Sequence, residues 1–196
     1  MDRLGIVAAT FSGLSFADLQ ELAQEAESAG FEAIFLPEFM NDALANCQIV
    51  LPVTSWLKAA SWIANIYLRH PALCAQTAVA IDYTSRGRLI LGLGVSHRPI
   101  VEGVYQEHME RPRDFLRQYL TTVRDIVTGQ GYPGAPVQPQ GTGGFRDVAV
   151  VFGEHPLDML PSNPVSSHRI LRRRRKGPIA GVERPINCIG IGWLGK

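Results

Sequence analysis

The chain lacks most features that mark secreted, membrane-spanning or metal-binding proteins. Its three cysteines, Cys47, Cys74 and Cys188, form no C-x-x-C spacing, and its five histidines show no spacing typical of metal ligands. The N-terminus has no basic region followed by an apolar core, and no 18-residue run is free of charge. We therefore predict free thiols in a cytoplasmic protein, with no signal peptide, no membrane association and no bound metal.

Charge, proline and glycine are unevenly distributed along the 196 residues. Residues 1–128 carry a net charge of −4 and residues 129–196 a net charge of +5, and 8 of the 13 prolines and 12 of the 19 glycines follow residue 128. A hydrophobic fraction of 46% is sufficient for a packed core. We divide the chain into a globular part at 1–129 and a Pro/Gly/Arg-rich tail at 130–196. For the tail, an altered reading frame and disorder are both open.

Hydrophobic periodicity before Gly129 indicates four strands that alternate with four helices. The strands are expected at 4–10, 33–36, 57–67 and 87–95, and the helices at 16–29, 42–51, 71–86 and 113–128. This alternation predicts an α/β fold with a parallel sheet, and both a doubly wound sheet and a (β/α)₈ barrel fit it. In either architecture, ligands bind at the carboxyl ends of the strands. Asp147–Phe152 and Ile186–Trp193 are candidates for further strands.

Local signals mark where two of the helices begin. Ser15 precedes Asp18 by three residues, which resembles a capping box, and His70 followed by Pro71 is typical of a helix start. Within the helix that follows Pro71, we expect the buried stripe to contain Leu73, Thr77, Ala80 and Ile81.

The segment 87–99 is the strongest candidate for a ligand site. Large apolar residues alternate with residues on the other face, where the side chains become small at Gly92, Gly94 and Ser96. We expect that a ligand approaches this backbone closely, and we prefer this interpretation to one in which the glycines serve only core packing. His97 and Arg98 follow directly, as a cofactor contact or as a solvated loop. A dinucleotide-binding fingerprint is rejected, because His97 replaces its third glycine. Candidate polar groups at expected strand ends are Glu38, Asn65, Ser96 and His97.

Four ordered motifs resemble the luciferase-like monooxygenase superfamily. They are AGFEAIFLPE at 29–38, WIANIYLRHP at 62–71, GRLILGLGVSHRP at 87–99 and RPRDFLRQYL at 111–120. Among these motifs, IANI and GVSH are most similar to the branch that uses the deazaflavin coenzyme F(420). FMN is the alternative cofactor.

This resemblance implies a (β/α)₈ TIM barrel, of which about four βα units are recognisable here. It also implies a flavin-like ring over the strand ends, backed by a non-prolyl cis peptide around 63–65. Phe39 stands where the family often has histidine, which puts a histidine-mediated contact in doubt. The implied catalytic residues are Glu38 and His97, and the implied cofactor-binding residues are Ala64, Asn65, Gly94, Val95 and Ser96.

The implied activity is hydride transfer between coenzyme F(420) and a small organic substrate. The alternatives are an FMN-dependent monooxygenase and a non-catalytic remnant whose run Arg172–Lys176 binds polyanions. We expect that run to be solvated, with no nucleic acid or membrane as partner, and a homo-oligomer is left open. Such a barrel needs about 250 residues, so we expect low activity from this polypeptide.

Overall fold

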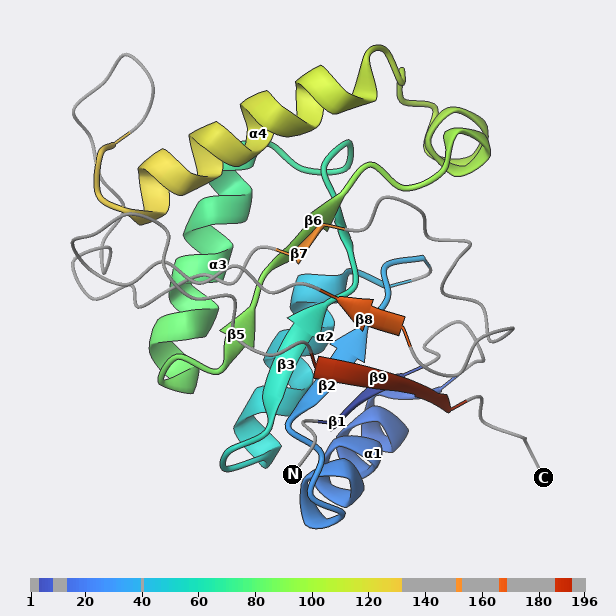
Figure 1. Cartoon of the computed structure of the whole chain (residues 1–196), viewed down its shortest axis with the longest axis vertical. Helices are drawn as coiled ribbons and strands as arrows, with labels where there is room; N and C mark the ends of the chain where they lie inside the picture. Colours follow the sequence, from blue (N-terminus) through green and yellow to red (C-terminus); the bar gives the residue numbers. More distant parts are fainter. Residues whose placement is uncertain are drawn as a thin grey trace. The chain divides into compact units, whose positions relative to one another are not determined.

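The computed structural model describes residues 4–8, 14–39, 41–131, 151–152, 166–168 and 186–191 (Figure 1). The run Arg172–Lys176 and most of the tail lie outside the described residues. The chain divides into two compact units. The first comprises Met1–Ala64, Arg88–Leu93 and Asp147–Lys196, and the second comprises Asn65–Gly87 and Gly94–Arg146.

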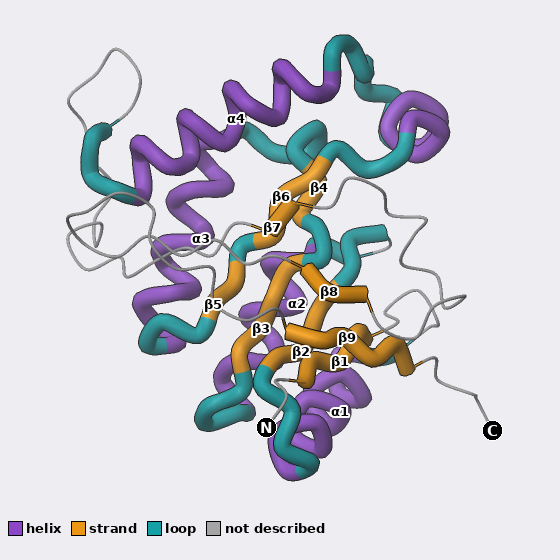
Figure 2. Tube along the Cα trace, viewed as in Figure 1, coloured by secondary structure: helices purple, strands orange, loops and turns teal. Residues whose placement is uncertain are grey.

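The first unit is built on a mainly parallel sheet with the order β5-β3-β2-β1-β9-β8. Strands β1, β2, β3 and β5 run parallel to their neighbours, with Ile6 opposite Ile34, Ile34 opposite Ala59 and Ala60 opposite Ile90. Strand β9 lies parallel to β1 on its other side, and β8 pairs antiparallel with β9. The strands, orange in Figure 2, are β1 (Leu4–Ala8), β2 (Ala33–Leu36), β3 (Lys58–Ser61), β5 (Leu89–Ile90), β8 (Ser166–His168) and β9 (Ile186–Ile191).

Helix α1 (Phe16–Ser28) begins with the predicted capping box. The Ser15 hydroxyl accepts the Asp18 N–H at 3.2 Å, and the Asp18 carboxylate accepts the Ser15 N–H at 2.9 Å. These two bonds satisfy backbone donors that a helix start leaves unpaired. After the helix, Gly30 adopts a φ of 86°, a left-handed conformation that glycine tolerates at a helix end.

Helix α2 (Ala43–Val50) begins at Asp42 and continues into the short 3₁₀ helix η2 (Leu51–Val53). The Asp42 carboxylate accepts the N–H groups of Leu44 and Ala45 at 2.7 and 3.1 Å. Helix α2 contacts α1, β2 and β3, so it links the first two βα units. The segment that follows η2 is held by Arg88, whose guanidinium donates to the Leu51 and Leu57 carbonyls and to the Thr54 hydroxyl at 2.7, 3.1 and 2.9 Å.

Glu27 provides a second long-range contact to the same segment. Its carboxylate accepts the backbone N–H groups of Ser55, Trp56 and Leu57, at distances between 2.6 and 2.9 Å. An acidic residue in the last turn of a helix opposes the helix dipole. The bonds to these three amides therefore stabilise the carboxylate at this position, and they hold the backbone that leads into β3.

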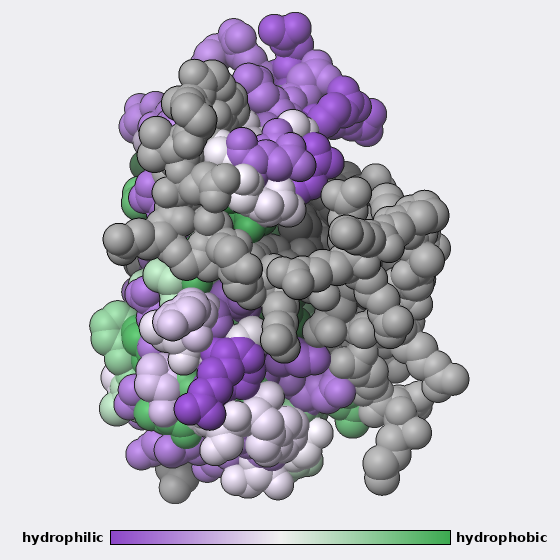
Figure 3. All heavy atoms as spheres, turned by 90° about the vertical axis from the view of Figure 1, so that its left-hand side faces the viewer, coloured by the Kyte–Doolittle hydropathy of each residue, from purple (hydrophilic) through white to green (hydrophobic). Residues whose placement is uncertain are grey.

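The second unit contains α3 (Pro71–Ser85), the π-helical segment η3 (Pro99–Val104) and α4 (Pro112–Val127), and α3 packs against α4. His70 caps α3 as predicted, since its Nδ1 accepts the Ala72 N–H at 3.2 Å. The Tyr119 hydroxyl of α4 donates to the Arg69 carbonyl at 3.1 Å. The exposed side of α4 includes Arg113, Arg117 and Arg124. Figure 3 shows hydrophilic residues gathered at the upper end of the face that it draws.

Two details differ from the sequence-based expectations. The strands expected at 57–67 and 87–95 are each interrupted, into β3 and β4 (Ala64–Asn65) and into β5 and β6 (Gly92–Gly94); β6 lies between β4 and β7 (Val151–Phe152) in a second sheet. The stripe expected on α3 is correct at Ile81, which is buried, and wrong at Leu73, which is 56% exposed. The buried side of α3 holds smaller residues, such as Ala75 and Ala78.

The alternation of strands and helices and the parallel pairing confirm the predicted α/β class. None of the helices in the described ranges has the length and apolar character needed to cross a bilayer.

Candidate active site

The end of β3 is shaped by a cis peptide bond between Trp62 and Ile63, at the edge of the segment where the sequence predicts one. The Trp62 ring packs edge-on against Phe35 of β2, with ring centroids 4.8 Å apart. Both belong to a buried apolar cluster with Ala33, Ala60 and Ile90. The cis peptide therefore adjoins a packed core.

Ser61 connects β3 to β6 through its side chain. Its hydroxyl donates to the Gly92 carbonyl and accepts the Gly92 N–H, each at 2.8 Å, and the residue is fully buried. A Cβ atom at Gly92 would lie 2.1 Å from the Ser61 carbonyl oxygen, so the backbones can approach only because position 92 is glycine. The expectation that a ligand approaches Gly92 is thus wrong, since the neighbouring strand takes that space.

Glu38 and Ala64 belong to the first unit. Glu38 is half-buried after β2, and its carboxylate accepts the Ala43 N–H at 3.1 Å, at the start of α2. Ala64 is fully buried in β4. The structure therefore gives Glu38 a role in supporting a helix start, and the catalytic role remains a prediction.

The predicted residues of the second unit lie on two neighbouring segments. Asn65 is buried, and its side-chain oxygen accepts the Tyr67 N–H at 3.0 Å. Directly after it, the Ile66 N–H donates to the Gly94 carbonyl at 3.1 Å. This bond places the residues that follow β4 beside the end of β6, so Asn65 and Gly94 lie on neighbouring segments, and their role as cofactor-binding residues remains a prediction.

Val95, Ser96 and His97 continue from Gly94 as a half-buried segment. Ser96 has a φ of 57°, a left-handed conformation that is uncommon for a residue with a side chain. The His97 carbonyl accepts the N–H groups of Ile100 and Val101, both at 2.9 Å, which ties His97 to the start of η3. Ser96 therefore makes the turn between the strand and the helical segment.

Arg98 and Glu102 form an ion pair on the exposed side of this turn. The Glu102 carboxylate also accepts the Met109 N–H at 3.3 Å, so the pair connects η3 to the loop before α4. Arg98 is thus paired with a carboxylate of its own chain. The sequence indicated a cofactor contact or a solvated loop, and it did not predict this ion pair.

Tyr67 is a further candidate that the sequence did not indicate. Its hydroxyl oxygen is buried and has no hydrogen-bond partner in the part of the chain that the structure describes. Burial raises the pKa of the Tyr67 phenol, the positive charge of Arg98 opposes this effect, and the negative charge of Glu102 adds to it. No pattern in the sequence reveals an unpaired hydroxyl; only the position of Tyr67, two residues beyond Asn65, could have drawn attention to it.

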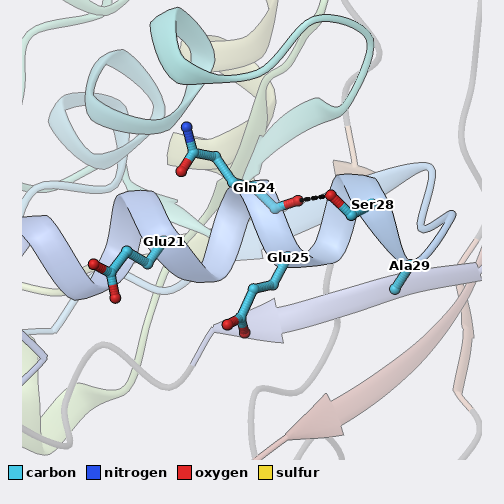
Figure 4. A pocket seen from close by; sticks show the side chains of 5 residues that line it. All are labelled: Glu21, Gln24, Glu25, Ser28 and Ala29. Carbon is cyan, nitrogen blue, oxygen red and sulfur yellow. Dashed lines mark hydrogen bonds between the residues drawn. The ribbon is translucent and has the colours of Figure 1, made fainter.

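A shallow pocket on α1 contains none of the predicted site residues. Figure 4 shows its two glutamates pointing to the same side of the helix, and the Ser28 hydroxyl donates to the Gln24 carbonyl at 2.8 Å. The pocket is lined by Glu21, Gln24, Glu25, Ser28 and Ala29. In the described ranges, no group of three or more His, Cys, Asp or Glu side chains is arranged to hold a metal ion.

The fold and the candidate site together define a parallel β/α protein whose polar groups follow the ends of its strands. Comparison with known proteins gives the family directly. The sequence model of the luciferase-like monooxygenase family matches residues 3–166, so the chain belongs to this family. The match continues past Gly129 and includes β7, whereas the division of the chain at that residue remains a prediction.

Curated relatives include an oxidoreductase named for coenzyme F(420) and a reductase. A proposed coenzyme F(420)-dependent oxidoreductase of Mycobacterium tuberculosis is 33% identical over 133 residues, which cover 64% of this chain and 38% of the relative. The 5,10-methylenetetrahydromethanopterin reductase of Methanopyrus kandleri is 31% identical over 78 residues, which cover 39% of this chain and 22% of the reductase. The chain thus matches less than half the length of either relative.

Solved structures of similar fold include both FMN and F(420) proteins. The oxygenating constituent of 3,6-diketocamphane monooxygenase from Pseudomonas putida, in complex with FMN, aligns with a TM-score of 0.61 at 18% identity, covering 72% of this chain and 50% of that structure. The coenzyme F(420)-dependent tetrahydromethanopterin reductase of Methanopyrus kandleri aligns with a TM-score of 0.59 at 20% identity, covering 72% and 45%. These alignments establish the luciferase-like barrel fold for the part of the chain that they cover.

Proposed function

We propose that the chain contributes to an oxidoreductase site that transfers a hydride between coenzyme F(420) and a small organic substrate. The observation that carries this proposal is the 33% identity, over 133 residues, to the mycobacterial relative named as F(420)-dependent. The IANI and GVSH motifs support the same branch. The deazaflavin ring supplies the hydride chemistry when it is bound, and the protein positions it.

The residues of the second unit fit a flat ring placed against their backbone. Gly94 is buried but has no side chain, and Val95 and Ser96 after it are half-buried, so part of this stretch is accessible. The fixed positions of Asn65 and Gly94, joined through the Ile66 N–H, provide a rigid support. We assign Ala64, Asn65, Gly94, Val95 and Ser96 to the coenzyme.

In this proposal, Glu38 and His97 are polar contacts of the substrate. His97 is half-buried, and its carbonyl accepts two hydrogen bonds from η3, so its backbone is held in a defined position. The partner is a small molecule in the cytoplasm, not a nucleic acid or a membrane, and a homo-oligomer is compatible with it.

An FMN-dependent monooxygenase is the second candidate. It is kept because one of the solved structures that share this fold, from Pseudomonas putida, is a complex with FMN. The two candidates share the same segment for the ring and differ in the coenzyme.

Titration of the purified chain with F(420) and with FMN, followed by coenzyme fluorescence, tests the proposal. We expect tighter binding of F(420), and we expect Gly94→Ala to weaken it by placing a methyl group where the ring lies. Gly103→Ala is the matched control, because a Cβ atom there would meet no atom of a non-neighbouring described residue within 4 Å. Equal or tighter FMN binding favours the monooxygenase, and binding of neither coenzyme refutes both candidates.

A further inference from the structure

The hydroxyl of Tyr67 is a polar group that the fold itself does not explain. Its oxygen is buried, and none of the described residues forms a hydrogen bond with it. A buried hydroxyl without a partner destabilises a protein, and native structures pair most such groups with protein, water or a ligand. Among the described residues, this oxygen therefore lacks the partner that a buried hydroxyl usually has.

Tyr67 is held in place by contacts at both its backbone and its ring. Its N–H donates to the side-chain oxygen of Asn65 at 3.0 Å, and its ring packs against Phe115 with centroids 5.0 Å apart. Turning the side chain towards solvent would remove the contact with Phe115. The hydroxyl is thus kept in its buried position by two separate interactions.

The same contacts set Tyr67 beside the stretch that we assign to the coenzyme. The Ile66 N–H donates to the Gly94 carbonyl at 3.1 Å, so the residue before Tyr67 is bound to the start of that stretch. The phenol is protonated at neutral pH, since tyrosine ordinarily titrates near pH 10 and burial raises the pKa of Tyr67 further. A neutral phenol can donate a hydrogen bond to an oxygen acceptor.

We propose that the Tyr67 hydroxyl donates a hydrogen bond to an oxygen of the bound coenzyme. This inference rests on the proposed function, since it requires a coenzyme against the Gly94 stretch. It makes Tyr67 a binding residue whose hydroxyl costs stability in the free protein and gains its partner only in the complex.

Tyr67→Phe is the test, because it removes the hydroxyl and keeps the ring on Phe115. We expect the melting temperature of the ligand-free variant to be equal to that of the wild type or about 2 °C higher. We expect its dissociation constant for the preferred coenzyme, F(420) or FMN, to rise about 10-fold, as for the loss of one good hydrogen bond.

Two tyrosines of the same unit serve as controls. Tyr119→Phe removes a hydroxyl that does have a partner, the Arg69 carbonyl at 3.1 Å, so its melting temperature should fall. Tyr83 is 75% exposed on α3, and Tyr83→Phe should change neither stability nor affinity.

Each other outcome overturns the inference in a recognisable way. If Tyr67→Phe melts at a lower temperature or fails to fold, the hydroxyl supports the fold and not a ligand. If its coenzyme affinity equals that of the wild type, the inference fails while the proposed function stands. If the wild type binds neither coenzyme, the proposed function and the inference fail together.

Discussion

The carboxylate of Glu27 provides the clearest quantitative test of how the first unit is held together. It accepts three consecutive backbone N–H groups, those of Ser55, Trp56 and Leu57, at 2.6–2.9 Å. Hydrogen bonds to a charged group contribute about 1.5–3 kcal/mol each when they are shielded. Ser55 and Trp56 are exposed, so water can pair with their N–H groups when the carboxylate is removed. We therefore take about 2 kcal/mol for the contribution of all these hydrogen bonds together.

Glu27→Ala should therefore lower the free energy of unfolding by about 2 kcal/mol, and Glu27→Gln, which keeps one acceptor oxygen, by about 1 kcal/mol. With a urea dependence of about 2 kcal/mol per molar, the first change moves the unfolding midpoint by about 1 M. Circular dichroism during urea titration at pH 7 measures this shift. Glu25→Ala is the matched control on the same helix, because Glu25 is exposed, and it should change stability by less than about 0.5 kcal/mol.

The pH dependence has a defined sign. Partial burial raises the pKa of the Glu27 carboxyl, but the bonds from Trp56, Leu57 and Ser55 and the charge of Arg88 together hold it below its ordinary value. A lowered pKa stabilises the folded state above the unfolded pKa of about 4.3, and this stabilisation is lost as the pH falls through the folded value. The difference in the free energy of unfolding between wild type and Glu27→Ala should thus be smaller at pH 3 than at pH 7. A difference in unfolding free energy below about 0.5 kcal/mol at pH 7, or a difference that is the same at pH 3, would refute this account.

Three further predictions concern buried or strained positions. Gly92→Ala should cost about 3 kcal/mol, because its methyl group would overlap the Ser61 carbonyl, while Gly103→Ala should be nearly neutral; chemical denaturation compares them. Asn46 is fully buried, and neither of its side-chain polar atoms has a hydrogen-bond partner among the described residues. Asn46→Leu should therefore raise the melting temperature, and a fall would mean that a trapped water pairs these atoms. Ser96→Val should be less stable than Ser96→Gly by about 2 kcal/mol, since its φ of 57° disfavours branched side chains, and equal stabilities would contradict that conformation.

Local sequence signals predicted the local structure well. The Ser15 capping box, the His70 cap and the order of strands and helices depend on neighbouring residues, and each was found where its pattern lies. The cis peptide was placed within one residue, through a family resemblance and not through periodicity. Contacts within about four residues are thus accessible from the sequence alone.

The remaining features depend on contacts between residues far apart in the chain. The glycine at 92 was expected to admit a ligand, but its neighbour is Ser61, 31 residues earlier. The Glu27 and Arg88 bonds also join residues about 30 positions apart. On α3, burial follows the packing against α4 rather than side-chain size, which explains why Leu73 is exposed. No single-sequence pattern encodes these distances.

The pairing of Ser61 with Gly92 also has an evolutionary consequence. The serine hydroxyl both donates to and accepts from the glycine backbone, and the glycine leaves no room for a side chain. If either residue is replaced, the hydrogen bonds that the other one makes are lost, and selection no longer maintains the other residue. Among descendants of this chain, we expect the two positions to be inherited as a unit and to diverge only together.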